Sequence, residues 1–498
     1  MKPFRPESEV GRGDEDPPFP CLSAIIKDEM ETRLEHDLLG DLEVPADIYY
    51  GIQTYRAVQN FNLSGTKLSD YPSFVRALAM VKHACADANH ALGQMADDRH
   101  EAIVHACQRV VNGEFSDQFP VDMIQGGAGT STNMNMNEVV ANIGLEFMGR
   151  KKGEYAHLHP NNDVNMSQST NDVYPTAIRL GLLLEQQSVV ASLDRLIDSL
   201  ESKAGELADV LKMGRTQLQD AVPMTMGQEF HAFASTLADD ADYLRQDAKR
   251  LLYDVNLGGT AIGTGINTHP DYAGLAVARL AAVSGEAMRP ARDLIAATYD
   301  MGAFVMLSSA LKRLAMRLSK MCNDLRLLGS GPRTGLQELN LPPRQPGSSI
   351  MPGKVNPVIP EAVNQVAFAV IGNDVAITMA AEAGQLQLNV MEPLVAYKLF
   401  ESQRLLARSM DMLRELCIVG ITANATHSRQ LMENSIGLVT ALNPFIGYEN
   451  STRIAAKALE TGRGVLELVR EEKLLADDVL EEVLKPENMM RPRVAAHS

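Results

Sequence analysis

The segment at residues 347–357 brings together hydroxyls, a cation and an amide, a set of groups that could hold an anion. It reads Gly-Ser-Ser-Ile-Met-Pro-Gly-Lys-Val-Asn-Pro, with a glycine on each side of its hydroxyl-bearing stretch. Because glycine adopts backbone conformations closed to other residues, this stretch could swing over a ligand. Pro357 suits the first turn of a helix and Asn356 its cap, so free backbone N–H groups and the ammonium of Lys354 would face one small volume. That volume favours an anion, although a surface turn before a helix is the plainer interpretation of the segment alone.

Three more polar segments have the same design, with hydroxyls or amides directly upstream of a predicted helix. They lie at residues 130–133, 167–172 and 215–220, the last two followed by Pro175 and Pro223. Helix N-termini carry unpaired N–H groups and partial positive charge, so four of them together could hold two carboxylates. Each segment alone is explained by helix capping, but their recurrence favours an anion site.

Composition limits the class of protein. The 498 residues predict two or three domains, and 45% apolar residues with a net charge of −17 indicate an acidic globular protein. Nucleic acid is therefore an unfavoured partner, and an anionic substrate needs a locally built site. The five cysteines show no CxxC spacing, which favours reduced thiols in a cytosol-like compartment.

Most of the chain has the apolar periodicity of helices. The leucine and methionine positions from 307 to 325 alternate steps of four and three, the seam of a helix packed in a bundle. Such long helices would form a bundle too elongated for one chain to cover, so we expect self-association. The predicted helices span residues 72–92, 98–112, 134–148, 173–212, 223–254, 289–328, 357–383 and 390–420.

The predicted domains are a flexible tail, a mixed and mostly helical domain, a central helical bundle and a small C-terminal helical domain. The tail is rich in proline and lacks the apolar stretch of a targeting signal. We find no stretch of about 18 uncharged apolar residues, so no membrane span is predicted. The boundaries are 1–30, 31–170, 171–424 and 425–498.

The segment at 347–357 resembles the signature of the fumarase/aspartase superfamily, lyases that remove a proton next to a carboxylate and expel a group to leave fumarate. The resemblance extends from about residue 33 to residue 490. It implies a mainly α, three-domain fold with a central bundle of long helices, which forms a twenty-helix core in a tetramer. The other stretches that carry it are 127–138, 159–172, 214–223, 256–267 and 379–393.

Two places are more similar to the aspartase branch than to the fumarase branch. After Lys-Val-Asn-Pro the chain continues Val-Ile-Pro-Glu-Ala-Val-Asn-Gln at 358–365, whereas fumarases typically continue with a Thr-Gln-Cys-Glu type of sequence. Gln217 stands where fumarases carry histidine and many bacterial aspartases carry glutamine. The resemblance therefore implies reversible removal of ammonia from L-aspartate to give fumarate.

The resemblance also implies roles for individual residues. Ser348 would be the general base that takes the Cβ proton, and its alkoxide would need backbone N–H groups and nearby positive charge. Charge would then collect on the adjacent carboxylate as a doubly charged aci form. The implied substrate-binding residues are Lys354, Asn356, Thr216 and Thr130 for that carboxylate, Ser169, Thr170 and Asn171 for the other carboxylate and the amino group, and Gln217 as an orienting amide.

The implied enzyme uses no organic cofactor, has no assigned metal-binding residues, is cytoplasmic, and builds each site from loops of three subunits of a homotetramer. Two other functions stay open, a fumarase and a non-catalytic binding protein on the same scaffold. His159 is similar to the family's secondary anion site, and a plain loop histidine is an equal alternative. A metal site at His157, His159 and Asp163 has only generic spacing.

Overall fold

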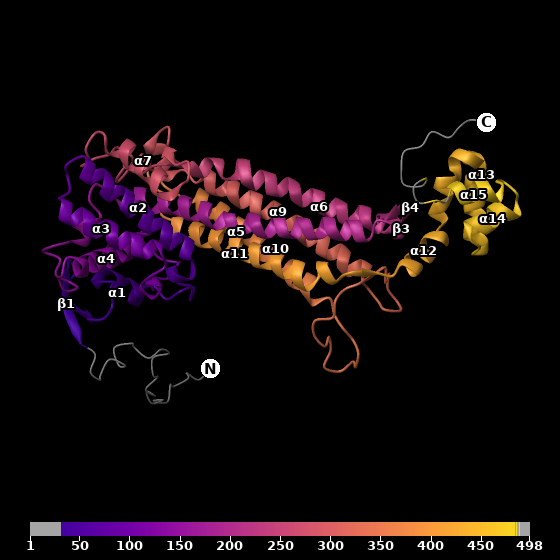
Figure 1. The fold of residues 1–498 in the computed structure, drawn as a ribbon, viewed down its shortest axis with the longest axis horizontal. Coiled ribbons are helices and arrows are strands. Elements are labelled where there is room, and N and C mark those ends of the chain that lie inside the picture. Colours follow the sequence, from indigo (N-terminus) through magenta and orange to yellow (C-terminus); the bar gives the residue numbers. More distant parts are fainter. Residues whose placement is uncertain (1–30, 484, 486–487, 489–498) are drawn as a thin grey trace, which may run out of the picture.

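The computed structural model describes residues 31–483, 485 and 488, so the predicted tail at 1–30 lies outside the described residues. The described chain begins with an antiparallel hairpin, and four helices then pack on one another at the same end of the molecule (Figure 1). These elements are β1 (Thr32–Asp37), β2 (Gly40–Pro45), α1 (Ile52–Asn60), α2 (Pro72–Ala91), α3 (Asp97–Val111) and α4 (Thr130–Phe147).

Five long helices form the elongated centre of the molecule (Figure 1). They are α5 (Thr170–Glu206), α6 (Met226–Tyr243), α9 (Gly302–Leu328), α10 (Val358–Glu382) and α11 (Glu392–Leu416). The predicted seam on α9 is confirmed, because its six leucine and methionine positions are at most 2% exposed. The prediction of a mainly α fold with a central bundle of long helices is therefore confirmed.

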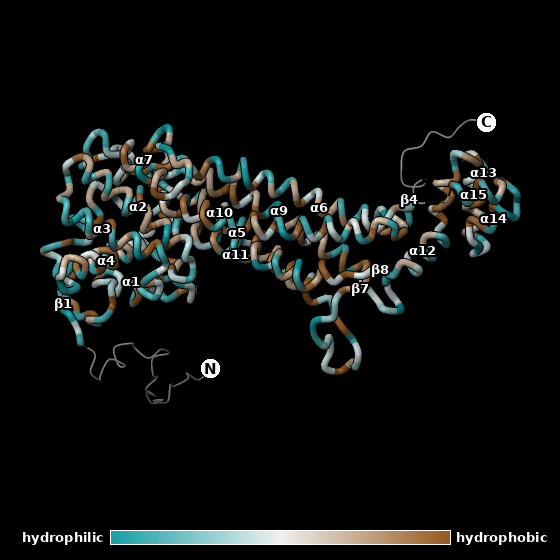
Figure 2. Tube along the Cα trace, viewed as in Figure 1, coloured by the Kyte–Doolittle hydropathy of each residue, from teal (hydrophilic) through white to brown (hydrophobic). Residues whose placement is uncertain are grey.

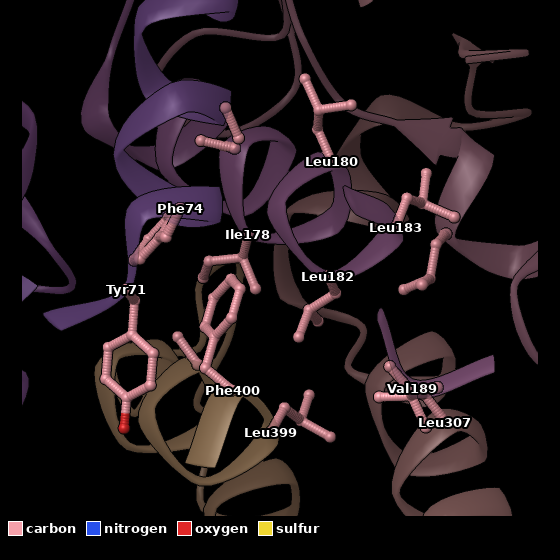
Figure 3. Close-up of a cluster of buried hydrophobic side chains, with 14 of the residues drawn as sticks. Tyr71, Phe74, Ile178, Leu180, Leu182, Leu183, Val189, Leu307, Leu399 and Phe400 are labelled. Carbon is pink, nitrogen blue, oxygen red and sulfur yellow. The ribbon is translucent and has the colours of Figure 1, made fainter. Parts of the chain in front are cut away.

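Aromatic side chains join the N-terminal helices to the bundle. The rings of Phe74 on α2 and Phe400 on α11 stack with centroids 5.0 Å apart. Figure 3 shows this pair beside Tyr71, next to Ile178 and Leu182 of α5. Because all of these side chains are buried, the first turns of α5 are fixed against two other helices.

Three predicted helices are shorter than the apolar pattern suggested. The helix predicted at 173–212 begins at Thr170 and ends at Glu206, so Pro175 lies inside its second turn rather than at its start. The helix predicted at 223–254 ends at Tyr243 and continues as a π-helical turn, Leu244–Ala248. The helix predicted at 289–328 is divided into α8 (Leu294–Tyr299) and α9, because the Asp293 side chain accepts hydrogen bonds at the N-terminus of α8 and the helix stops before Met301.

The remaining helices lie at the two ends of the bundle. Figure 1 shows α7 (Tyr272–Ser284) beside α2 at the N-terminal end. The C-terminal helices have a separate small core around Leu442, Ile454 and Leu468. They are α12 (Ala425–Glu433), α13 (Val439–Thr461), α14 (Val465–Glu471) and α15 (Asp477–Val483).

Helix α10 is the one helix of the described chain that is long and apolar enough to cross a membrane by length and composition. Hydrophobic residues recur along the helices of the bundle in Figure 2. Only 39% of the most apolar window of α10 is buried within the chain, although α10 packs against both α9 and α11. It also carries Asp374, whose carboxylate contacts Lys312 Nζ at 2.5 Å. The apolar composition of α10 is therefore equally that of a helix in a bundle with one face left uncovered by its own chain.

Candidate active site

The loop at residues 347–357 holds the hydroxyl of Ser348 against its own backbone. Ser348 Oγ accepts hydrogen bonds from the backbone N–H groups of Ile350 at 3.2 Å and Met351 at 3.0 Å. Two donors on one hydroxyl oxygen stabilise negative charge there, as backbone amides do in an oxyanion hole. The sequence predicts that a Ser348 alkoxide would need backbone N–H donors, and the loop contains two of them.

The two ends of this loop are joined at Gly347. Its N–H donates to the Lys354 carbonyl oxygen at 2.7 Å, and its own carbonyl accepts from Asn356 Nδ2 at 2.7 Å. A Cβ on Gly347 would lie 2.7 Å from the Lys354 oxygen, so this position requires glycine. Lys354 itself is exposed.

The predicted cap of α10 is wrong. Helix α10 begins at Val358 with Pro357 as its N-cap residue, and no side chain caps it. The reason is that the amide of Asn356 is used to close the loop at Gly347. Asn356 therefore positions the Ser348 loop directly.

A second group of predicted site residues meets at the N-termini of α4 and α5. Thr130 is the first residue of α4, and its hydroxyl donates to the Gly127 carbonyl at 2.8 Å. Ser169 caps α5 and accepts from the Asn171 N–H at 3.2 Å. The Thr170 hydroxyl oxygen accepts from Asn133 Nδ2 at 3.1 Å. Four predicted residues, Thr130, Ser169, Thr170 and Asn171, thus lie on two helix N-termini joined through one asparagine.

A buried lysine behind this group was missed by sequence reasoning. Lys82 Nζ donates to Asn133 Oδ1 at 2.7 Å, Gln168 Oε1 at 2.8 Å and Asn165 Oδ1 at 3.0 Å. Burial lowers the pKa of Lys82 to about 8. The lysine ties α2 to the first turn of α4 and to the segment before α5. Its signal in the sequence is a lysine in the stretch at 77–86, which is apolar apart from Lys82 and His83.

Asp172 fixes a third segment against the start of α5. Its Oδ1 accepts from the Ser169 N–H at 2.9 Å, which completes a capping box. Its Oδ2 accepts from the N–H groups of Gly258 at 2.9 Å and Thr260 at 3.0 Å. Burial raises the pKa of Asp172 to about 6, while these three backbone donors act in the opposite direction.

The segment at 215–220 is a β-hairpin tip, so the prediction of a helix start at Pro223 is wrong. Pro223 lies in strand β4 (Gln219–Thr225), which pairs antiparallel with β3 (Leu211–Thr216). Helix α6 begins only at Met226, where the Thr225 hydroxyl caps it. The backbone of Gln217 has φ 54° and that of the next residue φ 61°, as a two-residue hairpin turn requires. Thr216 and Gln217 therefore project from a hairpin instead of a helix N-terminus.

The predicted site residues do not all meet within one chain. Helix α5 has 37 residues and is therefore about 55 Å long. Thr170 is at its start, while β3 begins five residues after its end, and Figure 1 shows β3 and β4 at the opposite end of the bundle from α4. The Ser348 loop belongs to the β3 end, because β7 (Leu339–Asn340), just before the loop, pairs with β8 (Thr422–Ala423), just before α12.

His159 lines a cavity of about 610 Å³ near α1. Its Nδ1 accepts from the Asn161 N–H at 3.0 Å, and burial lowers its pKa. Arg56, Ser131 and Asn161 also line this cavity. Its role as a second anion site stays a prediction.

Comparison with known proteins agrees with this architecture. Residues 40–372 match the lyase family model, and residues 438–491 match the model of the fumarase C C-terminus. An aspartate ammonia-lyase of Pseudomonas aeruginosa is 71% identical over 93% of this chain and 98% of its own length. The Escherichia coli aspartate ammonia-lyase is 55% identical over 93% of this chain and 97% of its own.

Two solved structures have the same fold. A fumarate lyase/delta crystallin of Brucella melitensis, bound to cobalt, matches with a TM-score of 0.90 and 55% identity, over 93% of this chain and 100% of its own. A class II fumarase of Schistosoma mansoni matches with a TM-score of 0.86 and 35% identity, over 92% of this chain and 99% of its own. With identities this high over nearly the whole chain, the protein belongs to the fumarase/aspartase superfamily of lyases, in the branch of the aspartate ammonia-lyases.

Proposed function

We propose that this chain catalyses the reversible elimination of ammonia from L-aspartate to give fumarate. The observation that carries the chemistry is the Ser348 hydroxyl oxygen, which two backbone N–H groups hold at 3.0 and 3.2 Å. The relatives named aspartate ammonia-lyase support the choice of substrate. Gln217 supports the same choice of substrate. Its neutral amide can orient a substrate and donate a hydrogen bond, but it does not take up or release a proton.

In the proposed reaction the Ser348 alkoxide takes the proton from Cβ of L-aspartate. The electron pair moves onto the adjacent carboxylate, which becomes the doubly charged aci form. Lys354 and Asn356 stabilise that charge, together with the hydroxyls of Thr216 and Thr130. The pair then returns to form the C=C bond as the C–N bond breaks.

The other end of the substrate is assigned to the start of α5. Ser169, Thr170 and Asn171 hold the second carboxylate and the amino group, where the partial positive charge of a helix N-terminus favours an anion. An amino group that binds as ammonium leaves as neutral ammonia, so C–N cleavage needs no separate acid. The serine then returns its proton to solvent before the next turnover.

We propose that the site is shared among three subunits of a homotetramer in the cytoplasm. The length of α5 supports this, since Thr170 and Thr216 of one chain lie at opposite ends of the bundle. Helix α10 supports it too, because Phe368, Val375 and Met379 are 63%, 56% and 68% exposed along one stripe. Covering that stripe with helices of other copies would bring distant loops together.

One assay separates this function from its rivals. Fumarate absorbs in the ultraviolet, so its formation can be followed first with L-aspartate and then with L-malate. We expect fumarate from L-aspartate. Fumarate from L-malate alone would make the protein a fumarase, a function that the likeness to the Schistosoma enzyme keeps in view. Fumarate from neither substrate would indicate a binding protein on the same scaffold.

A further inference from the structure

A cluster of buried charges lies beneath the hairpin that carries Thr216 and Gln217. The Glu338 side chain is fully buried and makes two ion pairs. Its Oε1 lies 2.6 Å from Arg215 Nη2, and its Oε2 lies 3.3 Å from Lys212 Nζ. Lys212 also contacts Glu229 of α6, whereas Glu338 is the one acidic partner of Arg215 among the described residues. A buried carboxylate between two cations holds both of them in place.

The backbone of Glu338 is itself fixed. Its N–H donates to the Leu328 carbonyl at the end of α9 at 2.8 Å, and its carbonyl accepts from the Asn424 N–H at 2.9 Å. The carboxylate is therefore anchored to α9 and to the start of α12. An ion pair from such a rigid point fixes the position of its partner on β3.

The hairpin needs this support at the place where Glu338 contacts it. The pairing of β3 with β4 is irregular between Met213 and Arg215, and irregular pairing twists a hairpin and changes the direction of the residues that follow. Beyond the irregularity, Gln217 and Leu218 adopt left-handed backbone conformations without being glycine. Such conformations persist where the surrounding structure holds them.

The two strands are held separately. On β4, Asp220 Oδ2 accepts from the Ser435 hydroxyl at 2.7 Å. On β3, Lys212 is held further from the tip, and at the tip Arg215, the residue immediately before Thr216, is held by its ion pair with Glu338. Loss of that ion pair would free the β3 side of the tip while the β4 side stayed anchored.

We propose that Glu338 is a positioning residue for substrate binding, which acts through Arg215 to fix the direction of Thr216 and Gln217. The inference rests on the proposed function, because it takes those two residues as substrate contacts. Glu338 does not touch the substrate. It determines the position of the Thr216 hydroxyl and the Gln217 amide at the tip of the hairpin.

The test is Glu338→Gln, which keeps the side-chain volume and removes the charge. We expect kcat/KM for L-aspartate to fall about tenfold in the otherwise unchanged enzyme. In a background that carries both Thr216→Val and Gln217→Ala, the same change should cost less than about twofold, because both contacts that Glu338 positions are already gone. A purely structural role would lower the active fraction equally in both backgrounds, and that equal loss would overturn the proposal, as would an unchanged kcat/KM for the single variant.

The matched control is Asp374→Asn, which neutralises another buried carboxylate that pairs with a lysine, on α10. Its kcat/KM should stay within about twofold of the wild-type value. If Glu338→Gln does not fold, Arg215→Gln removes the same ion pair from the other side and should give the same tenfold loss.

Amide hydrogen exchange provides a readout that does not depend on activity. Exchange at residues 211–225 should be faster in Glu338→Gln than in the wild type or in Asp374→Asn. Unchanged exchange there would contradict the positioning role. If the wild-type protein does not convert L-aspartate, the proposed function fails, and the exchange result still decides whether Glu338 holds the hairpin.

Discussion

In the proposed reaction, removal of the Cβ proton depends on how well the Ser348 hydroxyl oxygen can carry negative charge. A serine hydroxyl is normally a poor base, and the two N–H groups of Ile350 and Met351 shift it toward the alkoxide. The role of this serine could be inferred from the sequence only by resemblance, because serines in glycine-rich turns are common. The donors on its oxygen were expected on chemical grounds and are present in the loop.

Replacing Ser348 with alanine should remove the base without disturbing the helices. We expect kcat to fall at least about a thousandfold, with helix content and assembly unchanged by circular dichroism and sedimentation. Ser349→Ala is the matched control, since it changes the neighbouring hydroxyl and should keep kcat within about threefold. A Ser348→Ala enzyme with near-normal kcat would refute the assignment of the base.

Lys82 should make stability depend on pH in a defined direction. Its pKa is about 8 in the folded protein, lowered by burial from 10.5. Below pH 8 Lys82 is protonated in both the folded and the unfolded chain, so the folded protein is destabilised by the full free energy of burying the ammonium. Between pH 8 and 10.5 the unfolded chain binds more protons, so the free energy of unfolding rises with pH, and above 10.5 the cost is gone.

Urea unfolding at several pH values would measure this effect. Relative to Lys82→Met, the wild-type free energy of unfolding should gain about 3 kcal/mol between pH 8 and 10.5. The comparison between the two proteins removes the contributions of other titrating groups. If the difference in unfolding free energy between the wild type and Lys82→Met stays constant from pH 8 to 10.5, Lys82 is already neutral or is not buried.

At the scale of elements, periodicity predicted the helices well and their ends poorly. The buried seam of α9 follows directly from its leucine spacing. The hairpin at 211–225 was missed because an apolar helix pattern leads into it through Leu207 and Leu211, and a proline before a helix is a common start signal. Pro223 instead occupies a strand position, and α6 takes its start from the Thr225 cap.

Lys82 and Asp172 illustrate a second limit of the sequence. Both are charged residues inside helices whose partners come from segments far away in the chain. Their local patterns, a lysine in an apolar stretch and an aspartate in a capping box, do not name these partners, so only the packing reveals that they join the polar loops. The domain boundaries at 170/171 and 424/425 stay a prediction.

The turn before α4 offers a test of packing at this scale. Gly129 has φ 89°, and a Cβ there would lie 2.4 Å from the Tyr174 ring. Gly113 has φ 90° with open space around it, so it is a matched control for backbone strain alone. We expect Gly113→Ala to cost about 1 kcal/mol of unfolding free energy and Gly129→Ala about 2 kcal/mol more, measured by urea unfolding. Equal losses would mean that the ring can move aside.

At the scale of the whole molecule, the elongated shape of the chain separates the predicted site residues from one another. The helix N-termini at Thr130 and Thr170 lie at one end of the bundle, and the hairpin with Thr216 lies at the other (Figure 1). A bundle about 55 Å long does not bring these loops together within one chain, and in the proposed function another copy of the chain spans the distance. The exposed apolar stripe on α10 is the surface that we propose other copies cover.

Mixing two inactive variants tests this account most directly. Ser348→Ala chains and Asn171→Ala chains would be co-expressed or reassembled together, with each variant alone as the control. If different subunits supply the two residues, a site in a mixed tetramer receives both intact with a probability of about one quarter, so about a quarter of wild-type activity on L-aspartate should return. Activity no higher than that of the separate variants, in tetramers shown to contain both chains, would mean that one chain supplies both residues and would contradict the shared site.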